Sequence, residues 1–523
     1  MNVHKILLCT VVAALILSVL GFATAAAAPN EYSSGELPLG QPRIKETRTT
    51  QEVAPGVTYT LIERGYQSKQ DFYTVDVAFK ADSNAAEGVA SELRADGYEP
   101  RIEEITERAP DDPEGGPLGY LVRTGVFKAE TDANALKTRL EADGYTGLRV
   151  VYTGQDGRET TGPWVVHVLK IDPALYNGTL APELATEVVP ERETLTSIVA
   201  RTDALAGTNG GYFVISPEDG TLGDLAGISM LDGNLVSEAV DGRTSLVLPE
   251  GSGEGADIAA LTDAILATAS DGARREVDGL NRKPGLIRAC GGEGGDIPTE
   301  NPKHDFTCTD SSELILFTPV FGTTTELGEG AEAVLDSSGR VTELRSQRGG
   351  AIPPNGSVLS GTGEAAQWLS THMQPGAKVA IKRTFMADGR TLKGSKSLGI
   401  INGGPRLLRG GSVDITAYAE GFHWPENPEF YYRFGVKRNP RTLAGIMPDG
   451  DLLLAAVDGH RPGYSVGASF RESAGIMGAL GADEAVNLDG GGSTTMTVGE
   501  TLVNRPSDAT GERPIGDAVV MLP

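Results

Sequence analysis

A strand-helix-strand pattern occurs twice in the first third of the chain and limits the fold of that region more than any other feature. In the first copy, residues 72–77 (FYTVDV) alternate as a strand does, and residues 84–94 have helical spacing before a stop at Asp96-Gly97-Tyr98. The second copy has a strand at residues 120–128, a helix at residues 132–141 and the same Asp-Gly-Tyr ending. The repeat predicts one small sheet with two helices on one face, a ferredoxin-like domain built from a duplicated β-α-β unit.

This region, residues 69–153, resembles the SPOR domain. The resemblance rests on the duplicated pattern and on short sequences such as Gly125-Val126-Phe127. In that family the domain binds septal peptidoglycan glycan strands stripped of their stem peptides, so the resemblance implies a glycan-binding domain with peptidoglycan strands as its partner. A structural module of the same topology that binds nothing is the alternative.

The remainder of the chain is predicted to form a second, larger domain at residues 160–523. Strand-like runs such as residues 164–169 and 314–317 alternate with glycine turns, and helices are predicted at residues 258–269 and 469–480. A chain of 523 residues exceeds the size of a single core. The predicted fold class is therefore α+β, with a large mixed-sheet domain beside the small ferredoxin-like one.

The N-terminus has the features of a secretory signal peptide at residues 1–28. His4 and Lys5 precede an apolar run, and residues 23–28 (ATAAAA) offer several A-x-A cleavage sites. An uncleaved anchor is the alternative. We expect a secreted protein, extracellular or associated with the cell wall, with no membrane association after cleavage. Residues 29–68 are polar and rich in Pro, Gly, Glu and Ser, which predicts a linker with one short strand at residues 57–62.

Two of the three cysteines are predicted to pair. Cys9 lies in the signal sequence, which leaves Cys290 and Cys308 in an oxidising compartment. Two reduced buried thiols are the alternative. A zinc site is not expected, because neither cysteine belongs to a C-x-x-C pair.

The charge of the chain argues against two classes of partner. The sequence has 45 basic and 71 acidic residues, a formal net charge of -26. Such a chain repels nucleic acid and anionic membranes, so neither is an expected partner. A small-molecule or glycan substrate fits better.

Five short motifs in the larger domain combine polar side chains with residues that permit tight turns. They are residues 209–213 (NGGYF), 401–405 (INGGP), 438–442 (RNPRT), 457–465 (VDGHRPGYS) and 487–496 (NLDGGGSTTM). Asp489 follows a short apolar run and precedes three glycines, which places it at a strand end where the chain turns sharply. That position suits a reactive carboxylate. A solvated turn with a capping aspartate is the alternative.

Taken together and in this order, the motifs resemble the phosphodiester glycosidase family, over residues 164–523. One member of that family removes N-acetylglucosamine from a phosphodiester. The resemblance implies a secreted hydrolase that cleaves the sugar C1–O bond of a sugar 1-phosphodiester, such as one of N-acetylglucosamine, in cell-wall or exopolysaccharide glycans. The alternative function is a non-catalytic protein that binds cell-wall glycans.

The leaving group of that reaction is a phosphate monoester, so stabilisation of charge matters more than protonation. Arg441 is expected to clamp the phosphate bidentately, and Asp489 or Asp458 to stabilise the oxocarbenium ion or activate water. The residues expected to bind substrate are Asn209, Gly210, Asn402, His460, Arg461, Gly490, Gly491, Gly492, Ser493 and Thr494. His460 stands where family members usually carry an arginine directly after the Asp-Gly pair. No cofactor and no metal ligand set are predicted, although oxygen ligands are plentiful enough to leave calcium or magnesium open.

Overall fold

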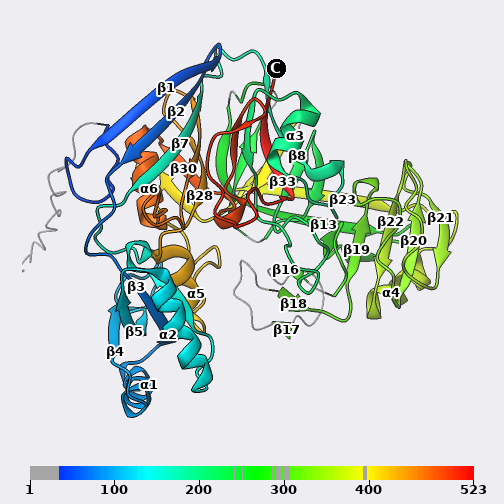
Figure 1. Cartoon of the computed structure of the whole chain (residues 1–523). Coiled ribbons are helices and arrows are strands. Elements are labelled where there is room, and N and C mark those ends of the chain that lie inside the picture. The colour runs from blue at the N-terminus through cyan, green and yellow to red at the C-terminus, as the bar shows by residue number, and fades with distance from the viewer. Residues whose placement is uncertain are drawn as a thin grey trace, which may run out of the picture.

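The structure is a computed structural model, and it describes residues 35–240, 242–249, 251–253, 255–285, 287–288, 297–298, 307–392 and 397–523 (Figure 1). The predicted signal peptide at residues 1–28 lies outside the described residues. Cys308 is buried, but Cys290 also lies outside them. The Cys290–Cys308 disulfide therefore stays a prediction.

The small domain has the predicted duplicated architecture. Its four-stranded antiparallel sheet has the order β4-β5-β3-β6, and two helices of equal length cover one face. The elements are β3 (Tyr73–Lys80), α1 (Ser83–Ala95), β4 (Pro100–Ile105), β5 (Gly119–Phe127), α2 (Glu130–Ala142) and β6 (Arg149–Tyr152). After each helix a glycine takes the left-handed conformation that ends it, Gly97 with φ +84° and Gly144 with φ +99°.

The other face of this sheet packs against the larger domain, which makes the two domains continuous. Arg123 on β5 is buried there and donates to Asp76 (2.7 Å), to both oxygens of Asp156 (2.5 and 2.9 Å) and to the Tyr432 hydroxyl (3.2 Å). Burial opposes ionisation of Asp156, but the charges of Lys437 and Arg123 lower its pKa to about 2. Both faces of the small sheet are therefore covered, one by helices and one by protein from the larger domain.

The first sheet of the larger domain has eight strands in the order β1-β2-β7-β29-β28-β30-β26-β27. The strands are β1 (Glu46–Ala54), β2 (Val57–Arg64), β7 (Trp164–Ile171), β26 (Arg406–Arg409), β27 (Ser412–Val413), β28 (Arg441–Ile446), β29 (Leu452–Val457) and β30 (Glu484–Asn487). Helix α6 (Phe470–Leu480) contacts β26, β28 and β30 of this sheet. It begins with a capping box of Ser469 and Glu472, which confirms the helix predicted at residues 469–480.

The predicted linker is wrong for residues 46–64, which form the β1–β2 hairpin at the edge of this sheet (Figure 1). Strand β2 pairs with β7 along its whole length, with Val57 opposite Ile171 and Arg64 opposite Trp164. The short strand predicted at residues 57–62 is confirmed as part of β2. The rest was missed because β1 is an edge strand whose mostly exposed side chains give it the polar composition of a linker.

A second sheet of eight strands has the order β11-β10-β25-β12-β13-β23-β24, with β14 paired to β13. Its strands are β10 (Ser229–Leu231), β11 (Asn234–Ser237), β12 (Arg243–Leu248), β13 (Asp257–Thr268), β14 (Arg274–Glu276), β23 (Ala380–Ala387), β24 (Arg390–Thr391) and β25 (Gly399–Asn402). The helix predicted at residues 258–269 is wrong, since this segment is β13. Its alanines and leucines favour a helix, but pairing with β12 and β23 on both sides overrides that preference.

Three smaller sheets complete the larger domain. A five-stranded sheet, β32-β31-β9-β33-β8, joins β8 (Thr179–Leu184), β9 (Ala206–Asn209), β31 (Met496–Val498), β32 (Thr501–Leu502) and β33 (Asp517–Leu522), with α3 (Leu195–Thr202) packed on it. Another, β15-β19-β22-β20-β21, joins β15 (Gly279–Leu280), β19 (Leu314–Phe317), β20 (Ala331–Leu335), β21 (Val341–Arg345) and β22 (Ser357–Gly361), with α4 (Gly363–His372) against it. The third joins β16 (Ile287–Arg288), β17 (Ile297–Pro298) and β18 (Thr307–Thr309). The mixed, strand-rich architecture confirms the α+β prediction.

Candidate active site

Three of the motifs meet because their strands run in opposite directions. Strand β28 is antiparallel to both β29 and β30, with Arg441 opposite Val457 and Leu443 opposite Asn487. The start of β28 therefore lies beside the ends of β29 and β30. This places Arg441 near the residues that follow those ends, Asp458 and Asp489.

The NGGYF motif reaches the same place from the five-stranded sheet. The Asp489 backbone N–H donates to the Gly210 carbonyl (3.2 Å), and the Asn209 side-chain amide donates to the Asp489 carbonyl (2.9 Å). The Asp489 carboxylate accepts from the Gly490 N–H (2.8 Å), and the residue as a whole is partly exposed. The backbone of Asp489 is thus fixed by hydrogen bonds at a position that is not fully buried.

The two asparagines predicted to bind sugar hydroxyls are instead part of this frame. Asn209 Oδ1 accepts from the Thr442 hydroxyl (2.6 Å) and the Thr495 N–H (3.1 Å). Asn402 Oδ1 accepts from the Tyr212 N–H (2.8 Å), and its amide donates to the Tyr212 carbonyl (3.3 Å). Both side chains are only 1% exposed. The structure therefore uses them to hold the turns together, in place of the predicted contact with sugar.

A second carboxylate beside Asp489, that of Asp517, was missed by sequence reasoning. Asp517 begins β33, where its Oδ1 accepts from the Gly211 N–H (2.8 Å) and its backbone carbonyl accepts from the Gly210 N–H (2.9 Å). Burial raises the pKa of Asp517 to about 7, and the charge of Asp489 adds to that effect. The only signal in the sequence is an aspartate before an apolar strand, which is too common to single out.

Arg441 lies in a different setting from the predicted bidentate clamp. Its Nε donates to the Ala468 carbonyl (3.0 Å) and its Nη2 to the Phe434 carbonyl. The guanidinium carbon lies 4.4 Å from the Phe470 ring centroid and 5.2 Å from that of Phe434. Burial lowers the pKa of Arg441 to about 10. These two bonds hold the guanidinium in place but use only two of its five N–H donors, so Arg441 supplies a fixed positive charge and the predicted clamp stays a prediction.

Asp458 is enclosed in the core, unlike Asp489. Its carboxylate accepts from the Tyr464 hydroxyl (2.8 Å), the Asn504 amide (3.1 Å) and the Arg505 N–H (3.0 Å). It also contacts His167 Nε2 at 3.2 Å, and Asp458 is 1% exposed. This saturated carboxylate is placed to hold loops together, so the structure separates the two aspartates that the sequence left equivalent.

His460 and Arg461 follow Asp458 on the adjoining loop. His460 is exposed, has φ +54° and contacts Asn439 Oδ1 through Nε2 (3.1 Å). Desolvation by the surrounding protein lowers the His460 pKa to about 4, with the charges of Lys437 and Arg441 acting in the same direction. Arg461 donates through Nη2 to the Pro506 carbonyl (2.6 Å). His460 is therefore a neutral ring at the surface of the site.

In the glycine loop after Asp489, two of the three glycine N–H groups are already bonded within the protein. The Gly490 N–H is bonded to its neighbour Asp489, and the Gly491 N–H donates to the Pro440 carbonyl (3.0 Å). The hydroxyls of Ser493 and Thr494 are buried, and neither has a hydrogen-bond partner among the described residues. These two hydroxyls are therefore the donors of the loop without a partner in the described part of the chain, and both lie below the protein surface.

Gly492 gives the loop a charged neighbour that the motifs did not indicate. A Cβ at Gly492 would lie 2.2 Å from Arg513 Nη2 and 2.2 Å from Asp508 Oδ1. Arg513 and Asp508 form a bidentate ion pair of 2.8 and 3.0 Å. Only glycine permits this close packing of an arginine against the loop.

Arg243 is the other cation that sequence reasoning missed. It begins β12 and is buried, with its guanidinium carbon 4.9 Å from the Phe422 ring centroid and 5.9 Å from that of Tyr212. Burial and the charge of Asp489 raise the pKa of Tyr212, while the charges of Arg441 and Arg243 oppose this. The Tyr212 hydroxyl donates to the Gly404 carbonyl (2.8 Å). Tyr212 thus lies among one carboxylate and two guanidinium groups.

The described part of the chain holds no group of three or more His, Cys, Asp or Glu side chains arranged to bind a metal ion. The site that it does form combines a partly exposed aspartate, a buried second carboxylate and three guanidinium groups, one of which, that of Arg513, is paired with Asp508. Such an arrangement can stabilise separated charges that develop during bond cleavage.

Two protein families match the chain. Residues 69–150 match the SPOR domain, and residues 329–522 match phosphodiester glycosidase. No curated protein matches. These matches confirm both resemblances drawn from the motifs.

Solved structures extend the likeness to most of the chain. A Burkholderia pseudomallei K96243 protein, provisionally described as exported, is 35% identical, with a TM-score of 0.86 over 93% of this chain and 98% of that one. A hypothetical Synechocystis protein is 18% identical, with a TM-score of 0.54 over 92% of this chain and 81% of that one, and shares the fold. The zebrafish N-acetylglucosamine-1-phosphodiester alpha-N-acetylglucosaminidase catalytic domain, auto-inhibited by its pro-peptide, is 14% identical over 86% of this chain and 88% of that one, at a TM-score of only 0.33. On the two family matches, the chain has a phosphodiester glycosidase domain that includes residues 329–522 and a SPOR domain at residues 69–150.

Proposed function

We propose that the chain is a secreted hydrolase that cleaves the C1–O bond of a sugar 1-phosphodiester, with Asp489 as the carboxylate that acts on the sugar. The observation that carries this proposal is the contrast between Asp489 and Asp458. Both follow a strand end at the same edge of the sheet, but only Asp489 is partly exposed. It is also the one held against the NGGYF turn.

The chemistry of the bond explains the charges around the site. Cleavage leaves positive charge on the sugar ring and places negative charge on the departing phosphate monoester. Asp489 acts on the sugar, where it stabilises the positive charge of the ring directly, forms a covalent bond to C1, or activates the water that attacks C1. The fixed charges of Arg441 and Arg243 and the arginine beside Gly492 stabilise the negative charge on the phosphate. The buried hydroxyls of Ser493 and Thr494 complete the set of donors.

The assay is hydrolysis of N-acetylglucosamine 1-(methyl phosphate) in water enriched in ¹⁸O. Cleavage at C1–O releases methyl phosphate and places the heavy oxygen on the sugar, whereas cleavage at P–O places it on phosphate. Mass spectrometry of the two products therefore identifies the bond. We expect label on the sugar and loss of the reaction in Asp489→Asn.

Asp483→Asn is the matched control, because Asp483 lies in the same segment but makes its hydrogen bonds through the backbone. Label on phosphate, or equal activity in Asp489→Asn and Asp483→Asn, contradicts the proposal. Turnover of no phosphodiester, with retained binding to cell-wall glycan, favours the non-catalytic glycan-binding alternative. Repeating the assay with a chelator tests whether calcium or magnesium contributes.

We further propose that the SPOR domain brings the enzyme to peptidoglycan glycan strands outside the cell. Support comes from the SPOR match and from the likeness to a protein provisionally described as exported. In the described part of the chain no helix has the length and apolarity needed to span a membrane. Because both faces of the small sheet are covered, a glycan strand is expected at its open edges, β4 and β6. Co-sedimentation of the full chain with peptidoglycan, with and without stem peptides, tests this, and equal recovery from both counts against it.

A further inference from the structure

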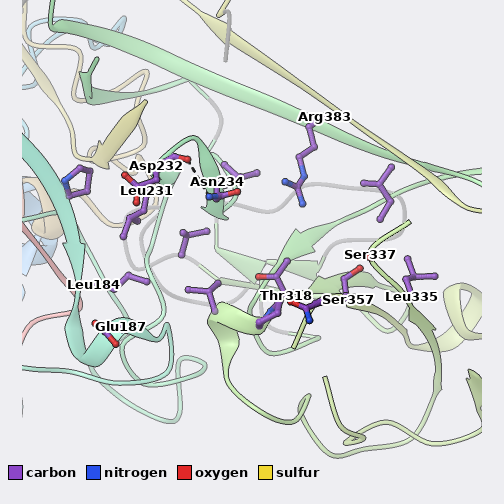
Figure 2. A pocket seen from close by; sticks show the side chains of 18 of the residues that line it. Leu184, Glu187, Leu231, Asp232, Asn234, Thr318, Leu335, Ser337, Ser357 and Arg383 are labelled. Carbon is purple, nitrogen blue, oxygen red and sulfur yellow. Dashed lines mark hydrogen bonds between the residues drawn. The ribbon is translucent and has the colours of Figure 1, made fainter. Parts of the chain in front are cut away.

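A cavity of 1040 Å³ lies apart from the motifs of the candidate active site (Figure 2). It is open to solvent and is bordered by β8, the β10–β11 hairpin, β23 and the loops around β20 and β22. Its volume is at the upper end of the range for small-molecule sites, about 300 to 1,000 Å³. None of its lining residues belongs to the five motifs.

The lining combines an aliphatic surface with charged groups and contains no aromatic side chain among the described residues. Its apolar members include Leu184, Leu231, Leu335, Val379 and Ile381. Sites that bind sugars or nucleobases rely on aromatic rings for stacking, and none is present here. The lining therefore favours a ligand with aliphatic groups.

One wall of the cavity is acidic. Glu183, Glu187 and Asp232 all line it, and Figure 2 shows Glu187 and Asp232 on the same side. Burial raises the pKa of Glu183, and the charges of Asp232 and Glu187 act in the same direction, although Arg201 at 3.7 Å opposes them. A ligand cation at this wall would stabilise the ionised carboxylates.

The side of the cavity across from that wall carries one arginine. Arg383 lies on β23, and its side chain points into the cavity (Figure 2). It makes no hydrogen bond or ion pair with any residue that the structure describes. Arg383 is exposed, although the protein around it lowers its pKa, with only the charge of Asp263 opposing. A ligand anion at this position would pair directly with its guanidinium.

Two strands that border the cavity are the last strands of their sheets. Strand β8 ends the five-stranded sheet, and β11 ends the second eight-stranded sheet. An edge strand has backbone N–H and C=O groups on its open side that can pair with another extended chain. Part of both edges is already occupied, since the Leu180 N–H on β8 donates to the Gly251 carbonyl (3.0 Å) and the Val236 carbonyl on β11 accepts from the Asn281 amide (2.9 Å).

We propose that this cavity binds a short aliphatic peptide in extended conformation, with its ammonium group at the wall of Glu183, Glu187 and Asp232 and its carboxylate at Arg383. Its ammonium group meets three carboxylates, two of which lie 3.7 Å from Arg201, and its carboxylate meets Arg383, which has no ion pair among the described residues. The aliphatic side chains contact the leucine and valine surface between them. The site is separate from the proposed hydrolysis, so it can fail or succeed independently of that activity.

Calorimetric titration of the full chain with the tetrapeptide Ala-Leu-Leu-Ala tests the proposal. We expect binding of the free peptide and roughly tenfold or greater weakening when its C-terminus is amidated or its N-terminus is acetylated, because each cap removes one charge-assisted contact. Arg383→Gln should weaken binding of the free peptide by a similar factor and abolish the difference in affinity between the free and the amidated peptide. Asp232→Asn should also weaken binding of the free peptide and abolish the difference in affinity between the free and the N-acetylated peptide.

Lys382→Gln is the matched control, because Lys382 is the neighbour of Arg383 on β23, is exposed as Arg383 is, and does not line the cavity. It should bind all peptides as the unmodified protein does. Circular dichroism establishes that the variants are folded. Absence of binding at millimolar peptide, equal affinity for free and amidated peptides, or retained discrimination in Arg383→Gln overturns the proposal. Binding of chitotetraose with no binding of peptide overturns it in favour of a sugar site.

Discussion

Replacement of Asp517 by asparagine should make the protein more stable at pH 8 and leave its stability nearly unchanged at pH 4. The pKa of this carboxyl is raised from 3.8 to about 7 in the folded protein, mainly by burial. Between these two values the folded state holds a proton that the unfolded state releases. The stability that Asp517 contributes is therefore fully present below about pH 4 and is lost as the pH rises to about 7.

The size of the effect follows from that difference of about 3 pH units. At about 1.4 kcal/mol per unit, the ionised carboxylate costs about 4 kcal/mol of stability at pH 8. Asparagine keeps an oxygen that can accept from the Gly211 N–H (2.8 Å) and never ionises. For a cooperative unit of about 490 residues, an unfolding entropy of about 2.1 cal/mol/K per residue converts this to a rise of about 4 °C in Tm.

The measurement is the difference in Tm between Asp517→Asn and the unmodified protein at pH 4, 5.5, 7 and 8. Taking the difference cancels the titration of the other carboxylates. Asp203→Asn, at an exposed position in left-handed conformation, serves as the control and should give a difference that does not vary with pH. A constant difference for Asp517→Asn as well, or one that grows toward low pH, would refute the reasoning.

Three further predictions separate the roles of other charged residues. Asp489→Asn should lower turnover of the sugar 1-phosphodiester by at least about 100-fold with no loss of Tm. Asp458→Asn should lower the free energy of unfolding by about 3 kcal/mol, because the buried oxygens of Asp458 accept from fixed donors. An equal loss of Tm in both variants, measured by thermal unfolding, would contradict the assignment. Arg123→Gln should lower the free energy of unfolding, measured with denaturant, by about 3 to 5 kcal/mol, because it leaves Asp156 buried without its main partner. Replacement of the exposed Arg139 by glutamine should leave the free energy of unfolding almost unchanged. The pH profile of turnover should lack an inflection from His460 near pH 6.5, since the lowered pKa of His460 keeps its ring neutral above about pH 4. The stability that the neutral His460 contributes is lost as the pH falls from 6.5 to 4. A profile whose inflection near pH 6.5 disappears in His460→Asn would contradict this.

The repeat and the motifs predicted the parts of the fold that depend on local pattern. The helices of the small domain follow from spaced apolar residues and a glycine stop, and both formed where expected. The error at residues 258–269 has a non-local cause. Strand β13 pairs with β12, which is near in sequence, and with β23, which lies more than 100 residues further on. No pattern within the segment reveals those partners.

Prediction of the candidate site was limited by the same difference between local and distant information. A glycine motif shows where the chain turns, so the segment containing Asp489 could be found from its neighbours in sequence. The same kind of local signal located three further residues, Arg441, Asn209 and Asn402. Whether the side chain of each one faces solvent or bonds to another part of the protein depends on its partners across the sheets. Asp517 and Arg243 stand at the first positions of β33 and β12 without a motif, and they reach the site only because antiparallel strands bring the start of one beside the end of another. A sequence motif therefore identifies the turns that build such a site, while the charges that surround those turns must be found from the pairing of the strands.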